Sequence, residues 1–184
     1  MSWLNQIKEK FSKRRIQTLV DQGRQQTRAF VDLESARKIG MIVNTSQSTP
    51  DDLKLIRTYM DALEKRNKEV LLIEINFIKK SEPVFTQAKK SIFINPAKLN
   101  WLDYPIPSVE NQIKQYNLDI LMNFDPSERM TSKYICSIAS AKTRTGMHVE
   151  GFESCYELMI DGQPDHELKT MIKEFDYFLN MIDK

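Results

Sequence analysis

Short apolar runs alternate with helical periodicities along most of the chain. Continuous runs rich in β-branched residues predict buried strands at residues 38–44, 69–75 and 118–124. Shorter runs predict further strands at 91–95, 142–147 and 156–161. Between the strands, apolar side chains recur every three or four positions and predict amphipathic helices, most clearly in the last helix, from Leu168 to Ile182.

Two helix starts are predicted from their capping residues. Thr49 suits an N-cap, Pro50 suits the first helical position, and the two acids that follow complement the positive end of a helix. Residues 125–128, Asp-Pro-Ser-Glu, repeat this pattern directly after a strand and predict a second start. Strand, helix and strand in this order form a βαβ unit. We therefore expect an α/β fold, a three-layer Rossmann-like sandwich with a mostly parallel sheet.

The first part of the chain differs from the rest. Residues 3–20 predict a basic amphipathic helix that precedes the sandwich, and the polar residues 21–35 predict a linker or a frayed continuation of that helix. We expect two parts, the helix with its linker at 1–36 and the Rossmann-like domain at 37–184. The predicted interaction face of the helix combines apolar and basic side chains, namely Trp3, Leu4, Ile7, Phe11, Lys8, Lys10, Lys13, Arg14 and Arg15.

Charge is divided unevenly along a chain whose net charge is only +2. Residues 1–38 hold nine Lys and Arg against four Asp and Glu, whereas the remaining residues hold eighteen against twenty-one. Such a basic head predicts one of four roles for residues 1–20: packing on its own domain, a homodimer contact, a protein partner or an anionic membrane surface. Nucleic acid is disfavoured, because the predicted strands are buried on both faces and offer no aromatic platform.

The sequence offers few candidates for a catalytic, metal-binding or ligand-binding site. Neither a GxGxxG pattern nor a P-loop pattern occurs, and the loops after residues 44 and 124 contain no glycine that would let backbone N–H groups approach a phosphate. His148 and His166 stand in polar segments outside any nucleophile or metal-ligand pattern, so we expect no catalytic residue, no metal and no cofactor. If a ligand binds at the carboxyl ends of the strands, the favoured residues are Asp125, Ser127 and Arg144.

The sequence also limits the compartment. No run approaches the roughly 18 apolar residues of a membrane span, and the first residues lack the apolar core of a secretory signal. Two cysteines, Cys136 and Cys155, are too few for a disulfide scaffold, and the first falls in a predicted helix where a buried thiol is expected. We expect a cytoplasmic protein, with peripheral attachment at the inner membrane face as an alternative.

Three segments carry a resemblance to a known family. They are FINPAKLNWLDYP at 93–105, the stretch from Asp119 to Gly146, and YELMID at 156–161 with the apolar helix that follows it. Together they resemble an uncharacterised Bacteroidota family that is described only as a domain of unknown function. That family is in turn similar to the N-terminal half of heptosyltransferase-like glycosyltransferases of the GT-B class, whose Ser-Gly-Ala-Lys…Arg-Ile-Gly phrase is echoed here by residues 139–146.

Two departures from the glycosyltransferases shape the functional expectation. The enzymes carry a Gly-Asp phrase after their first strand, where this chain has Asn44-Thr45-Ser46-Gln47, and their sugar-nucleotide site lies in a second half for which 184 residues leave no room. We therefore expect a non-catalytic α/β domain that acts by interaction. The alternative is a sugar-phosphate-binding or nucleotide-binding domain related to one half of a GT-B enzyme.

Overall fold

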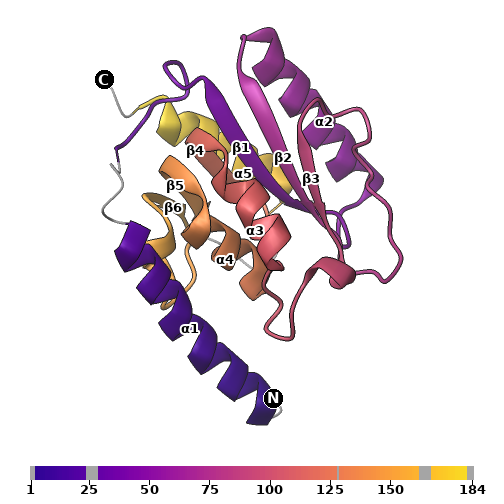
Figure 1. The fold of residues 1–184 in the computed structure, drawn as a ribbon. Coiled ribbons are helices and arrows are strands. Elements are labelled where there is room, and N and C mark those ends of the chain that lie inside the picture. Colours follow the sequence, from indigo (N-terminus) through magenta and orange to yellow (C-terminus); the bar gives the residue numbers. More distant parts are fainter. Residues whose placement is uncertain (1–2, 24–28, 128, 162–166, 182–184) are drawn as a thin grey trace.

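The computed structural model describes residues 3–23, 29–127, 129–161 and 167–181, and for residues 3–9, 22 and 23 it describes the backbone alone. Within this part of the chain, six parallel strands form one sheet in the order β3-β2-β1-β4-β5-β6 (Figure 1). The strands are β1 (Lys38–Asn44), β2 (Glu69–Ile75), β3 (Ser91–Ile94), β4 (Asn117–Asn123), β5 (Ser140–Met147) and β6 (Leu158–Ile160). This is the strand order of a Rossmann-type sheet, so the predicted fold class is confirmed.

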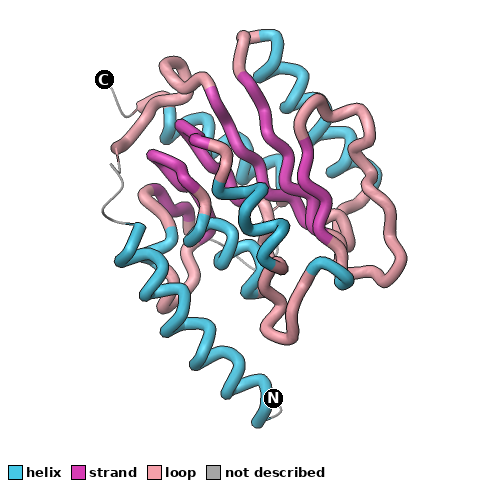
Figure 2. The backbone as a smooth tube through the Cα atoms, in the orientation of Figure 1, coloured by secondary structure: helices cyan, strands magenta, loops and turns pink. Residues whose placement is uncertain are grey.

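Helices cover both faces of the sheet, which makes three layers (Figure 2). The helices α1, α3 and α4 pack on one face, and α2 and α5 pack on the other. Their bounds, with those of two short 3-10 turns, are α1 (Trp3–Gly23), α2 (Pro50–Lys65), α3 (Pro107–Lys114), α4 (Met130–Ile138), α5 (Leu168–Leu179), η1 (Pro96–Lys98) and η2 (Glu153–Cys155). None of the helices described is long and apolar enough to cross a bilayer.

The central strands are apolar along their length because helices bury them on both sides. In β1 every residue after Lys38 is buried, and β2 shows the same pattern after Glu69. The helix predicted after β1 begins as expected, since Thr49 accepts a hydrogen bond from the backbone N–H of Asp52 in a complete capping box. The helix predicted from residues 125–128 begins later, at Met130, with Arg129 at its N-cap.

The segment predicted as a linker takes part in the core. Leu33 and Ala36 are fully buried in the layer that contains α2 and α5. The backbone N–H of Leu33 donates to the carbonyl of Leu179, at the end of α5 (3.3 Å), and the backbone N–H of Val31 donates to the Thr143 hydroxyl of β5 (2.8 Å). Residues 29–36 therefore pack as part of the domain and do not form a separate linker.

Candidate functional site

The chain leaves the adjacent strands β1 and β4 toward opposite faces of the sheet. After Asn44 it enters α2 on one face, and after Asn123 it passes residues 124–129 into α4 on the other. Such a switch point at the carboxyl ends of parallel strands is where open α/β sheets bind ligands. It is therefore the first place in this fold to examine for a site.

A buried network of amide and carboxylate groups joins the two strand ends. Asn44 Nδ2 donates to Asp125 Oδ1 at 3.2 Å, and the backbone N–H of Ser127 donates to the same oxygen at 3.0 Å. The backbone N–H of Asp125 donates to Asn123 Oδ1 (3.1 Å), and Asn123 Nδ2 donates to the hydroxyl of Tyr156 (2.8 Å). The structure thus brings Asp125 and Ser127 together in one turn at the switch point, as their sequence positions suggest.

Two polar atoms of this turn are buried and unpaired among the described residues. Asp125 Oδ2 and Ser127 Oγ are both shielded from solvent, and neither has a hydrogen-bond partner within the described part of the chain. Buried polar groups are nearly always paired, so an unpaired carboxylate oxygen calls for an explanation.

Arg144 lies away from this turn and has a different role. Its side chain is almost completely buried, with Nε donating to the carbonyl of Cys136 (2.8 Å) and an Nη group donating to the carbonyl of Ala139 (2.9 Å). The guanidinium also pairs with Glu157 at 3.3 Å. Arg144 therefore binds the last carbonyls of α4 and a neighbouring carboxylate, and its contacts do not join it to Asp125 or Ser127.

A cleft of about 650 Å³ opens on the other face of the sheet, between the beginnings of α2 and α5. Its apolar floor includes Phe124 and Leu55, and its rim includes Asp51, Asp52 and Lys169. The acids at the start of α2 occupy the positive helix end with the chain's own carboxylates, and Asp52 Oδ2 accepts from the backbone N–H of Thr49 at 2.9 Å. The start of α2 is thus already capped by the chain's own side chains.

Sequence reasoning missed Glu74, a fully buried carboxylate in β2. It accepts hydrogen bonds from the backbone N–H groups of Val84 (2.9 Å) and Phe85 (3.2 Å) and from the hydroxyl of Thr45 (3.1 Å). These bonds hold the long β2–β3 connection against the carboxyl end of the sheet. The signal was present in the sequence, because Glu74 interrupts an otherwise apolar strand.

The helix α1 has one face on the domain and another in solvent. Ile16 and Val20 are each about 1 % exposed and belong to the core layer of α4, whereas Phe11 is 63 % exposed. Lys10, Arg14 and Arg15 are also exposed, and Lys13 lies over the ring of Phe152 at 5.5 Å. The other members of the predicted interaction face lie outside the residues whose side chains are described, namely Trp3, Leu4, Ile7 and Lys8.

The comparison with family models identifies the relatives of this chain. A model described as a family of unknown function, DUF6913, matches residues 8–182. The chain belongs to DUF6913. Neither the curated proteins nor the solved structures contain a match. Membership in a family of unknown function is thereby confirmed, while the ties to Bacteroidota and to glycosyltransferases stay predictions.

In the described part of this DUF6913 chain, the two thiols and the imidazole of His148 lie outside any catalytic arrangement, and His166 falls outside the described residues. Cys136 and Cys155 are both fully buried, and burial raises the pKa of the Cys136 thiol far above its ordinary value, which disfavours the nucleophilic thiolate. His148 is half-exposed, with Nε2 lying 3.7 Å from the Glu153 carboxylate. Among the described residues, no three His, Cys, Asp or Glu side chains gather as metal ligands.

Proposed function

We propose that this DUF6913 protein acts by interaction, and that the outer face of α1 docks it on an anionic membrane surface, such as the inner face of the cytoplasmic membrane. The observation that carries the proposal is the exposure of Phe11, an aromatic side chain that is 63 % exposed beside exposed cations. An aromatic group flanked by Lys and Arg on one side of a helix is typical of interfacial binding.

Helix geometry supports a division of α1 into two faces. Phe11 and Val20 are nine positions apart, which places them roughly 180° apart around a helix. Val20 is buried in the domain, so the side that bears Phe11 faces solvent. Arg14 stands three positions after Phe11 and is its neighbour on the helix surface, and the exposed Lys10 stands four positions before Arg14 and is in turn the neighbour of Arg14.

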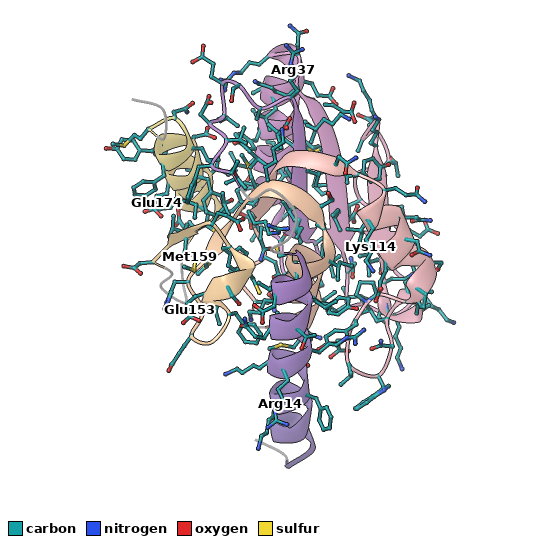
Figure 3. The ribbon with its side chains drawn as sticks, turned by 60° about the vertical axis from the view of Figure 1, so that its left-hand side comes forward. Arg14, Arg37, Lys114, Glu153, Met159 and Glu174 are labelled. Atoms are coloured by element: carbon teal, nitrogen blue, oxygen red, sulfur yellow. The ribbon has the colours of Figure 1, made fainter. Side chains whose placement is uncertain are left out.

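The position and charge of α1 favour a membrane as the partner. The amino-terminal end of α1 extends past the body of the domain (Figure 1), and the exposed Arg14 side chain points away from the domain (Figure 3). Basic residues near an anionic membrane contribute about 1 kcal/mol each. The residues after position 38 carry three more acids than bases, so an anionic surface attracts the α1 end of the molecule and repels the rest.

Vesicle co-sedimentation of the full chain tests this proposal. Binding is expected on vesicles of phosphatidylserine and phosphatidylcholine, and little on phosphatidylcholine alone. The double variant Lys10→Glu with Arg14→Glu is expected to lower the partition by at least about tenfold, because two attractive charges become repulsive. Phe11→Ser is expected to weaken binding as well, because it removes the apolar group that inserts.

A matched charge reversal on α2 serves as the control. Lys54→Glu with Lys65→Glu changes two exposed lysines by the same total charge at a distance from α1. This variant is expected to bind within about twofold of the unmodified chain, apart from a small general charge effect. Equal losses in both double variants, or equal binding to neutral and anionic vesicles, would contradict α1 docking.

We propose a second candidate function, a sugar-phosphate-binding or nucleotide-binding domain related to one half of a GT-B glycosyltransferase. The strand order favours it, because it places a switch point between β1 and β4. UDP-glucose at millimolar concentration is then expected to raise the unfolding temperature of the full chain, since a ligand of the native state stabilises it. An unchanged unfolding temperature with UDP-glucose and with glucose 1-phosphate would count against this candidate.

A further inference from the structure

We propose that the turn at residues 99–106 presents Trp101 as a second insertion point, which enters the same anionic membrane surface as Phe11. The inference rests on the proposed docking of α1 and adds a second part of the fold to it. The partner is a bilayer whose head groups carry negative charge above an apolar acyl layer. Two insertion points fix the orientation of the domain on that bilayer, which one helix alone does not.

The turn holds Trp101 in solvent through its own hydrogen bonds. Asn100 Oδ1 accepts from the backbone N–H of Tyr104 (3.2 Å), and the backbone N–H of Asn100 donates to the carbonyl of Tyr104 (2.8 Å). The hydroxyl of Thr131 in α4 donates to the carbonyl of Asp103 at 2.8 Å and ties the turn to the domain. Trp101 is nevertheless 67 % exposed. An ordered backbone that keeps so large an aromatic side chain in water is typical of a contact surface.

Trp101 and Phe11 lie at the same end of the molecule. The ring of Tyr104 stacks on that of Tyr134 in α4, with centroids 4.0 Å apart, and both tyrosines interact with Arg15 of α1. Phe11 precedes Arg15 by four positions and is therefore its neighbour on the helix surface. Figure 1 shows the connection between β3 and α3 at the same lower end of the picture as the amino-terminal end of α1. One flat surface can thus meet both aromatic side chains.

Charge at this end of the molecule favours an anionic surface. The segments around the two aromatic groups hold eight Lys and Arg against two Asp and Glu, and they are residues 10–15, 77–82, 98–106 and 129. The guanidinium of Arg129, at the start of α4, lies 4.0 Å from the centre of the Phe77 ring, and the lysines that follow this ring, Lys79 and Lys80, are exposed. Basic groups around an exposed aromatic side chain bind anionic head groups while the ring inserts beneath them.

The fluorescence of Trp101 reports whether this side chain inserts. The chain has two tryptophans, so the full-length variant Trp3→Phe emits from Trp101 alone. Vesicles of phosphatidylserine and phosphatidylcholine are expected to move this emission to shorter wavelength, because the indole leaves water for the bilayer interface. Phosphatidylcholine brominated on its acyl chains, mixed into these vesicles, is expected to quench it. Vesicles of phosphatidylcholine alone are expected to leave the emission unchanged.

Co-sedimentation of further full-length variants measures the contribution of Trp101 to binding. Trp101→Ala is expected to lower the partition onto the anionic vesicles by at least about tenfold, because it removes the aromatic area that inserts. Trp101→Tyr is expected to keep most of the binding, because tyrosine also favours the interface. The exposure of Trp101 predicts an almost unchanged unfolding temperature for both variants.

Tyr177→Ala is the matched control. Tyr177 is 60 % exposed on α5, which packs on the opposite face of the sheet from α1. This variant also loses an exposed aromatic ring, and its partition is expected to stay within about twofold of that of the unmodified chain.

The outcomes separate this inference from the docking of α1. Vesicle binding of Trp3→Phe without any change in its emission would remove Trp101 from the interface and leave α1 docking intact. A loss of binding in Trp101→Ala no larger than in Tyr177→Ala would do the same. If the unmodified chain did not bind anionic vesicles, both proposals would be wrong. A shift to shorter wavelength that grows with protein concentration in the absence of vesicles would assign Trp101 to a contact between copies of the chain instead.

Discussion

Replacing Arg144 with methionine is expected to lower the free energy of unfolding by about 3–5 kcal/mol. The substitution takes a nearly fully buried guanidinium out of a site where it binds the carbonyls of Cys136 and Ala139 and the carboxylate of Glu157. Those acceptors remain buried after the change and lose their charged donor, so most of the cost is the burial of groups that are no longer paired. Urea unfolding followed by circular dichroism measures the difference.

The same strand, β5, offers a matched control for this substitution. Lys142 also pairs with an acid, Asp119 at 2.8 Å, but its side chain is 54 % exposed. Lys142→Met is therefore expected to cost no more than about 1 kcal/mol, because exposed ion pairs contribute little. Arg144→Lys keeps the charge and loses the planar fork, so an intermediate loss is expected. A cost for Arg144→Met as small as that for Lys142→Met would refute the assigned role.

Replacing Leu33 with alanine is expected to cost about 2–5 kcal/mol of unfolding free energy. Leu33 is fully buried in the layer of α2 and α5, although it lies in a polar segment that reads as a linker. The smaller side chain leaves a cavity in that layer and removes apolar contacts beside the end of α5. The free energy of unfolding is again measured in urea. The two proteins are compared with the same slope of free energy against urea concentration.

Phe30→Ala is the matched control in the same segment, because Phe30 is 57 % exposed and its truncation is expected to change stability by no more than about 0.5 kcal/mol. If Leu33→Ala were equally harmless, residues 29–36 would be a spacer after all.

The packing of residues 29–36 on the domain also limits how α1 can be studied. Deletion of residues 1–36 would remove Leu33 and Ala36 from the core, so the point variants Lys10→Glu and Arg14→Glu are the sharper test of docking.

The strands were predictable because their signal is local. The apolar runs at 38–44, 69–75 and 118–124 match β1, β2 and β4 within a residue at each end. Helix starts were less predictable. Asp125 and Ser127 suit a cap and a turn equally well, and the structure uses them for a turn, with α4 beginning at Met130.

The site was predictable only in part. Asp125 and Ser127 are neighbours in sequence, so any turn at this point brings them together. The contacts of Arg144 depend on the face of the sheet toward which its side chain points. The strand sequence KTRTGM mixes polar and apolar residues, so its pattern does not predict that face. In the structure the side chain points toward the end of α4. Leu33 was missed because it belongs to a short apolar group, with Phe30 and Val31, that shows neither helical nor strand periodicity.

The hydrogen bond between Leu33 and Leu179 joins the early part of the chain to its last described helix. On the ribosome, residues 29–36 leave the exit tunnel long before α5 has been made. Their apolar side chains have no complete layer to enter until α5 has been synthesised, because contacts of such high sequence separation form only when both segments are present. The nascent chain therefore exposes part of the apolar α2 face until α5 has emerged from the ribosome, and nascent-chain chaperones are expected to bind it before then.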